Sequence, residues 1–221
     1  MAILKLHGGK QATCTRRVAT VLHELQVPFE LIEVDVANGA HKSPEYLKIQ
    51  PFGQIPYIDD DGFLLYETRA ICRYIAAKYP EYGLIPTEPK ANALFEQAAS
   101  VELTNFDPSA SKAGLQLWIR KMGYPFPTDD KIIADNLETL EKKLDAYEAI
   151  LSKQRYLAGE TITLADIFHL PYGVFVTYAG SESDSVMNRA SRPNVARWYK
   201  QLISRPSWLA YLDGVTTTTA Y

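Results

Sequence analysis

The chain has 221 residues, of which 47% are hydrophobic and 22% are charged, and this ordinary globular composition excludes a disordered chain, a collagen-like repeat and a coiled coil. Its 23 lysines and arginines face 26 acidic residues, so the net charge of −3 leaves no overall surplus of cations for sequence-independent binding to nucleic acid. No apolar run approaches the roughly 20 residues that span a bilayer, and residues 1–10 do not read as a secretory signal. We therefore expect a cytoplasmic protein.

The N-terminal part of the chain predicts a strand, a helix and a second strand. Residues 3–7 read as a short buried strand, and from Thr13 apolar residues recur with helical spacing until Pro28. Apolar and acidic residues then alternate over 29–36, which is typical of a strand. A strand–helix–strand unit of this length predicts two parallel strands.

The next segment predicts a hairpin followed by a helix. Residues 44–49 suit a short helical turn, and two short strands, 57–58 and 63–66, flank the turn signal Asp60-Asp61-Gly62. A helix is then expected over 68–79. Three prolines and a glycine in residues 80–89 predict a linker.

Beyond the linker the chain reads as helical. We expect helices over 91–106, 112–121 and 131–151, the last with Thr128 as its N-cap. Thr163 and Asp166 form a capping box that predicts the start of a buried helix reaching Leu170.

The two cysteines, Cys14 and Cys72, do not form a CxxC pair. A structural disulfide is not expected in a reducing compartment, and two separate thiols do not make a zinc site. Both cysteines are most simply interpreted as small buried hydrophobic residues.

Three short motifs could bind an extended ligand. Ile55-Pro56 is either a tight structural turn or, with a cis bond, a backbone edge that pairs with a peptide. Glu67-Thr68 opens a helix and either caps it or binds a carboxylate. His41 and Lys42 are either solvated or hold a second carboxylate. Together these motifs describe a groove for an extended ligand with a carboxylate at each end.

Several runs of sequence carry a specific resemblance over nearly the whole chain. They are Thr-Cys-Thr-Arg-Arg-Val (13–18), His-Lys-Ser-Pro-Glu-Tyr-Leu (41–47), Pro-Phe-Gly-Gln-Ile-Pro (51–56), Tyr-Glu-Thr-Arg-Ala-Ile (66–71), Val-Glu-Leu-Thr-Asn-Phe-Asp-Pro (101–108) and Tyr-Leu-Ala-Gly-Glu (156–160). Residues 1–79 resemble the glutathione-binding domain of a glutathione transferase, and the motifs are similar to the phi class.

The resemblance implies the glutathione transferase fold, in which an α/β thioredoxin-like N-terminal domain precedes an all-α C-terminal domain. The expected boundaries are 1–79 for the glutathione-binding domain, 80–89 for the linker and 90–221 for the helical domain with the hydrophobic substrate pocket. Glutathione is the expected co-substrate, no metal is required, and the protein is expected to be a homodimer with Phe52 inserted into the partner subunit.

The same resemblance assigns residues to each end of glutathione and to the second substrate. The assignments are His41 and Lys42 for the glycyl carboxylate, Gln54 and Ile55 with a cis Pro56 for the backbone, Glu67 and Thr68 for the γ-glutamyl end, and Leu115 and Ile119 for the pocket of the hydrophobic electrophile.

One position departs from the phi pattern. Ala12 stands where the phi class has a serine whose hydroxyl binds the glutathione sulfur, and His7 and Gly8 stand where other classes have a tyrosine. Losing one preorganised donor costs about 2.7–4 kcal/mol, or ~10²–10³ in rate, which predicts a slow enzyme instead of an inert one. Thr13 is the predicted replacement, through its hydroxyl or its N–H, unless it only opens the helix. Cys14 is a further candidate, through a mixed disulfide with glutathione.

The leading hypothesis is therefore a detoxifying glutathione transferase that activates the thiolate for attack on small hydrophobic electrophiles or for hydroperoxide reduction. Ala12 favours a second hypothesis, a glutathione-dependent or hydrophobic ligand-binding protein with little catalysis. A thiol reductase acting through Cys14 is a third, and a purely structural interaction module is a fourth.

Overall fold

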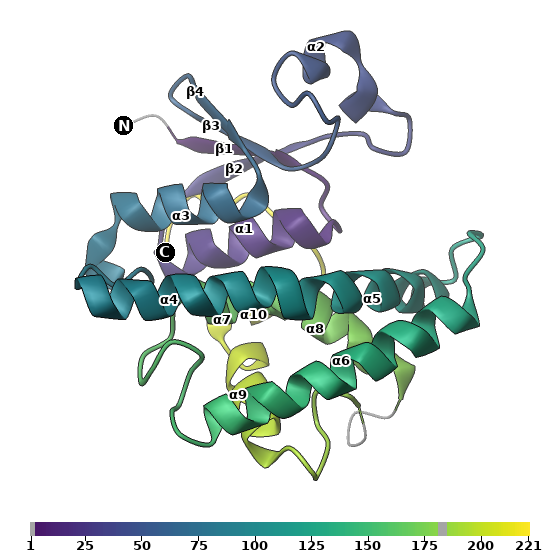
Figure 1. The fold of residues 1–221 in the computed structure, drawn as a ribbon. Coiled ribbons are helices and arrows are strands. Elements are labelled where there is room, and N and C mark those ends of the chain that lie inside the picture. The colour runs from purple at the N-terminus through teal and green to yellow at the C-terminus, as the bar shows by residue number, and fades with distance from the viewer. Residues whose placement is uncertain (1–2, 181–184) are drawn as a thin grey trace. The chain divides into compact units, whose positions relative to one another are not determined.

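The computed structural model describes residues 3–180 and 185–221. The chain forms two compact units, residues 1–85 together with 206–221, and residues 86–205 (Figure 1). The first is built on a four-stranded sheet and the second is helical, as the sequence predicts.

The sheet of the first unit has the strand order β2-β1-β3-β4. Strands β1 (Leu4–Gly8) and β2 (Phe29–Glu33) are parallel, as the βαβ pattern predicts, and the hairpin of β3 (Tyr57–Asp60) and β4 (Phe63–Tyr66) lies antiparallel beside β1. Strand β2 ends earlier than expected because its partner ends at Gly8, which pairs with Glu33.

Helices cover both faces of this sheet. On one face α1 (Thr13–Glu24) and α3 (Thr68–Lys78) pack together over Leu6 and Ile58, which are fully buried (Figure 1). On the other face lies the short helix α2 (Pro44–Leu47), which follows the 3₁₀ turn η1 (Ala40–Lys42). The ring of Tyr46 in α2 packs edge-on against the ring of Tyr57. The 3₁₀ turn η2 (Pro80–Tyr82) follows α3.

A polar cluster ties the β3–β4 hairpin to α3. Tyr74 donates a hydrogen bond of 2.6 Å to the carboxylate of Asp60, and Lys78 forms an ion pair with the same carboxylate. Burial raises the pKa of Asp60, but the hydrogen bonds from Lys78 and Tyr74 outweigh it and leave the pKa below its ordinary value. The carboxylate therefore stabilises the folded unit in its charged form.

The C-terminal segment belongs to the first unit, whereas the sequence places it in the helical domain. Helix α10 (Pro206–Leu209) buries Trp208, whose ring lies 3.7 Å from the guanidinium carbon of Arg16 on α1. Further on, Thr218 exchanges two backbone hydrogen bonds with Phe29 at the edge of β2. These contacts join residues far apart in the chain, so local sequence patterns do not predict them.

The second unit contains α4 (Pro89–Val101), a π-helical turn η3 (Glu102–Phe106), α5 (Asp107–Met122), α6 (Asp130–Leu151), α7 (Leu164–Ile167), α8 (Leu170–Val176), the 3₁₀ turn η4 (Thr177–Ala179) and α9 (Pro193–Ile203). The helix predicted over 91–106 and the next one are one continuous run with a π-helical turn. Pro108 follows this turn, and a proline cannot donate the hydrogen bond that a regular α-helix requires.

The N-cap of α6 is Asp129 instead of the predicted Thr128. The Asp129 carboxylate accepts hydrogen bonds from the N–H groups of Lys131 (2.8 Å) and Ile132 (3.3 Å). The hydroxyl of Thr128 instead accepts a hydrogen bond from the Nε of Arg120. A carboxylate also suits the positive end of a helix better than a hydroxyl does.

The predicted capping box is present at the start of α7. The Asp166 carboxylate is fully buried and accepts hydrogen bonds from the Thr163 N–H (3.0 Å), the Thr163 hydroxyl (3.1 Å), the Leu157 N–H (2.9 Å) and the Trp198 indole N–H (2.9 Å). The predicted helix does not continue without a break to Leu170, because α7 ends at Ile167 and α8 begins at Leu170.

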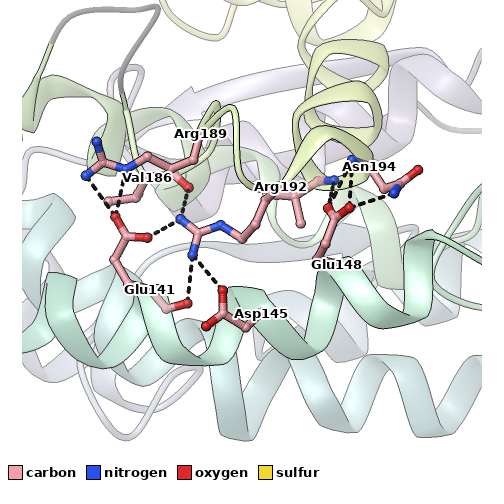
Figure 2. A network of polar contacts seen from close by, with 8 residues as sticks. Glu141, Asp145, Glu148, Val186, Arg189, Arg192 and Asn194 are labelled. Carbon is pink, nitrogen blue, oxygen red and sulfur yellow. Dashed lines mark hydrogen bonds and ion pairs between the residues drawn. The ribbon is translucent and has the colours of Figure 1, made fainter.

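An ionic network joins α6 to the segment before α9 (Figure 2). Arg192, 4% exposed, pairs with the carboxylates of Glu141 and Asp145, and Arg189 pairs with Glu141. Glu148 accepts hydrogen bonds from the first N–H groups of α9 and so caps that helix from α6. The network fixes the position of α9 on α6.

Candidate functional site

The N-terminus of α1 is the first element of the site. Strand β1 ends at Gly8, the chain turns, and Ala12 is the N-cap residue, with its N–H bonded to the Gly9 carbonyl at 3.0 Å. Thr13 is therefore the first helical residue. The side chain of the N-cap residue, Ala12, makes no hydrogen bond to the helix. The first N–H groups of a helix have no intrahelical acceptor and carry a partial positive charge, so they suit an anion.

The Ile55-Pro56 bond is cis, as the resemblance implies, and Ile55 lies beside this helix start. A Cβ atom added to Gly9 would lie 3.2 Å from the Cδ1 of Ile55 and 3.5 Å from the Cβ of Ala12. Ile55, Gly9 and Ala12 are thus adjacent in space. The backbone of the cis turn and the N-terminus of α1 belong to the same small region.

Sheet register explains why distant parts of the chain meet here. His7 of β1 pairs with Tyr57 of β3, and Tyr57 pairs with Tyr66 of β4. Strand β1 ends one residue past this row, β4 ends at it, and β3 begins at it. The loop to α1, the cis turn before β3 and Glu67 after β4 therefore lie at one edge of the sheet.

Glu67 has a backbone conformation that non-glycine residues rarely adopt. Its φ is 70° and its ψ is 108°, and its carbonyl accepts the first hydrogen bond of α3 from Ile71 at 2.8 Å. Its side chain is exposed, and the following Thr68 is buried. Such a conformation costs about 1–3 kcal/mol and is commonest at functional sites.

His41 and Lys42 are brought to the loop before the cis turn. The Lys42 ammonium donates a hydrogen bond of 3.1 Å to the carbonyl of Phe52. Gly53 has a φ of +59°, and a Cβ there would lie 2.7 Å from the Cδ of Lys42 and 2.9 Å from the carbonyl oxygen of His41. A larger residue at Gly53 would displace Lys42, so this glycine allows the lysine to approach the loop.

Two residues that the sequence analysis did not assign hold Gln54 in place. The Tyr46 hydroxyl donates a hydrogen bond of 2.7 Å to the Gln54 carbonyl, and the Gln50 side chain accepts one of 3.3 Å from the Gln54 N–H. Burial raises the pKa of Tyr46 to about 12, so the hydroxyl stays protonated as a donor. Neither residue has a sequence signal of its own, because each acts through a contact with a loop.

His7 and the two cysteines have less direct roles. The His7 ring stacks on Tyr57 with 4.2 Å between centroids, and burial lowers the pKa of His7. Cys72 is fully buried, as predicted for a small core residue. The same prediction is wrong for Cys14, which is partly exposed in the first turn of α1. Burial raises the pKa of Cys72 to about 12, which keeps it a thiol.

The predicted pocket residues lie in the helical unit. Leu115 and Ile119 are one turn apart on α5, and Leu115 is 48% exposed. The structure thus places them on neighbouring positions of one helix surface.

The described part of the chain, residues 3–180 and 185–221, has neither a metal-binding cluster nor a membrane-spanning helix. Within this part of the chain, no group of three or more histidine, cysteine or acidic side chains is arranged to hold a metal ion. In the same ranges, no helix combines the length and apolar character needed to cross a bilayer.

Two family models match the chain. The N-terminal domain of glutathione S-transferase matches residues 3–77, and the C-terminal domain of glutathione S-transferase matches residues 107–206. The chain belongs to the glutathione S-transferase family. The predicted fold and the predicted phi-class character of this glutathione transferase are confirmed.

Known glutathione transferases resemble this one over nearly their full length. Glutathione S-transferase PM239X14 of Arabidopsis thaliana is 44% identical over 204 residues, which cover 90% of this chain and 91% of the relative. Glutathione S-transferase hmp2 of Hypomyces subiculosus is 39% identical, covering 94% and 96%. The crystal structure of glutathione transferase F2 from Populus trichocarpa superposes with a TM-score of 0.87 at 39% identity, covering 95% and 97%.

Proposed function

We propose that this glutathione transferase binds glutathione along the edge of its sheet, activates the thiol at the N-terminus of α1, and transfers it to small hydrophobic electrophiles or uses it to reduce hydroperoxides. The observation that carries the proposal is the sheet register, which aligns the loop to α1, the cis turn and Glu67 at one edge. A solved relative, glutathione S-transferase I, is bound to lactoylglutathione, and the maize enzyme is in complex with an atrazine glutathione conjugate.

The proposed roles follow from the chemistry of each group. Glutathione is extended and carries a carboxylate at each end. Lys42 has three N–H donors, of which the Phe52 carbonyl takes one, so with His41 it can bind the glycyl carboxylate. The backbones of Gln54 and Ile55 would pair with the peptide.

At the other end of the ligand, Glu67 would bind the γ-glutamyl ammonium. Its carboxylate is exposed and supplies the opposite charge. The start of α3 at Thr68 would bind the adjacent carboxylate.

Thiol activation is proposed to rest on the helix start and on Thr13. A free thiol with a pKa of about 8.5 is mostly protonated at neutral pH, and the positive end of a helix stabilises its thiolate. Ala12 supplies no hydroxyl, so Thr13, the first residue of α1, supplies its hydroxyl or its N–H to the sulfur. On the second substrate, we propose that Leu115 and Ile119 contact the hydrophobic part.

We further propose a homodimer that works in the cytosol. Phe52 is 65% exposed, which is unusual for a phenylalanine, and a cavity of about 280 Å³ between α4 and α6 is lined by Leu94, Val101, Ile150 and Leu157 among others. The ring of Phe52 from one subunit would fill this cavity in its partner. Two free cysteines suit a reducing compartment.

Conjugation of glutathione to 1-chloro-2,4-dinitrobenzene, followed by absorbance, tests the proposal. We expect measurable turnover by the wild-type protein, a loss of about 10²-fold in kcat for Thr13→Ala if the hydroxyl is the donor, and a gain for Ala12→Ser. Saturable glutathione binding without turnover of aryl halides, isothiocyanates or hydroperoxides would contradict catalysis. It would favour the second candidate, a ligand-binding protein, for which Ala12 is the supporting observation.

A further inference from the structure

The last residues of the chain lie against the loop that leads into α1. The Val215 N–H donates a hydrogen bond of 2.9 Å to the Lys10 carbonyl, and the Gln11 side-chain amide donates one of 3.0 Å to the Asp213 carbonyl. Gly214, which lies between Asp213 and Val215 in the chain, is buried and has a φ of +109°. A Cβ at Gly214 would lie 2.8 Å from both the Nε2 of Gln11 and the Cγ of Lys10.

The same segment is anchored independently on both sides of this contact. After it, Thr218 pairs with Phe29 through backbone hydrogen bonds of 2.8 and 3.0 Å, and the Leu31 N–H donates to the Thr217 hydroxyl at 3.0 Å. Before it, Trp208 is buried beside α1. The segment is therefore a fixed support and not a free tail.

The loop that the C-terminal segment contacts leads directly from the end of β1 into α1. Residues 9–12 connect β1 to α1, and the tip at Lys10 and Gln11 is the part that the C-terminal segment holds. Inside the loop, the Ala12 N–H bonds to Gly9. A shift of the tip moves Ala12 and the first N–H groups of α1, and preorganised donors lose their effect when they are displaced by about 1 Å.

We propose that residues 213–215 of the C-terminal segment position the N-terminus of α1 for thiol activation, with Gly214 as the residue that permits the contact. The inference rests on the proposed function, because it concerns the position of the same helix start. Gly214 and Gln11 are positioning residues: they act on the sulfur through the loop and do not touch it.

The test compares Gly214→Ala, which disturbs the segment where it meets the loop, with Thr217→Val, which removes its hydrogen bond to β2 away from the loop. Gln11→Ala is a second, milder change at the loop. For each variant we would measure the pKa of the bound glutathione thiol by its ultraviolet absorbance, kcat and KM for conjugation, and the melting midpoint.

We expect Gly214→Ala to raise the pKa of the bound thiol and to lower kcat about tenfold with KM for glutathione little changed, since displaced donors weaken activation more than binding. Gln11→Ala should show the same pattern more weakly. Thr217→Val should lower only the melting midpoint, because the two backbone hydrogen bonds between Thr218 and Phe29 still anchor the segment. A pKa and kcat in Gly214→Ala equal to those of the wild type would overturn the inference alone, whereas an unshifted thiol pKa in the wild type would remove the proposed function.

Discussion

Replacing Asp166 by alanine should destabilise the helical unit strongly. This carboxylate is fully buried and is the common acceptor for two backbone N–H groups, the Thr163 hydroxyl and the Trp198 indole. Alanine removes the acceptor and leaves three buried N–H donors, on Leu157, Thr163 and Trp198, without it.

The expected magnitude follows from these contacts. A buried donor without a partner costs about 1–3 kcal/mol, so three would cost roughly 3–9 kcal/mol if nothing relaxed. Burial raises the pKa of the Asp166 carboxyl, with the hydrogen bonds opposing this effect, so deleting the group also recovers part of its desolvation cost. We therefore expect a net loss of about 3–5 kcal/mol, which corresponds to a fall in melting midpoint on the order of 10 °C.

Urea unfolding at fixed protein concentration, followed by circular dichroism and by tryptophan fluorescence, measures this loss. The matched control is Trp198→Phe, which removes one donor and leaves the other hydrogen bonds to Asp166 in place, and it should cost about 1–2 kcal/mol. A loss below about 1 kcal/mol for Asp166→Ala would refute the reasoning, because that is the range of a surface substitution.

Three further predictions concern charge and reactivity. Arg192→Met should cost about 1–3 kcal/mol in urea unfolding, because it removes a buried donor from the carbonyls of Glu141 and Val186 while Arg189 still pairs with the Glu141 carboxylate. Arg189→Met, at a side chain 35% exposed, should cost about 0–1 kcal/mol, and equal losses would contradict this difference. The pKa of Asp60 is lowered in the folded protein, so its carboxylate adds to the free energy of unfolding above its ordinary pKa of 3.8, and this contribution is lost as the pH falls. Asp60→Asn should therefore flatten the decline in the free energy of unfolding between about pH 5 and 3. An unchanged pH profile would contradict this prediction. Iodoacetamide should modify Cys14 in the native protein, because this thiol is partly exposed. It should modify Cys72 only after unfolding, because Cys72 is buried and burial raises its pKa to about 12. Modification of Cys72 before Cys14, detected by mass spectrometry, would contradict this prediction.

Local chemistry in the sequence predicts most of the elements. Alternation and helical spacing place the strands and helices of the first unit, and the capping box at Thr163 is found because both of its members lie within one turn. The linker prolines fall next to the unit boundary between Ile85 and Pro86.

Long-range packing sets what the sequence does not show. Nothing near Thr218 indicates that it pairs with Phe29, and Tyr46 supports Gln54 only because α2 folds beside the cis turn. Residue types in the sequence predict the members of the candidate site. These residues come together only because the sheet register places Glu67 at the same edge as the loop to α1. The roles of Thr13 and of the pocket residues stay predictions.

The central claim is that the N-terminus of α1 activates the glutathione sulfur although Ala12 supplies no hydroxyl. The direct measurement is the ultraviolet absorbance of the thiolate in the glutathione complex, titrated from about pH 5 to 9 with Thr13→Ala beside the wild type. In the wild type we expect a bound thiol pKa well below the free value of about 8.5. Saturable binding with an unshifted pKa would contradict it.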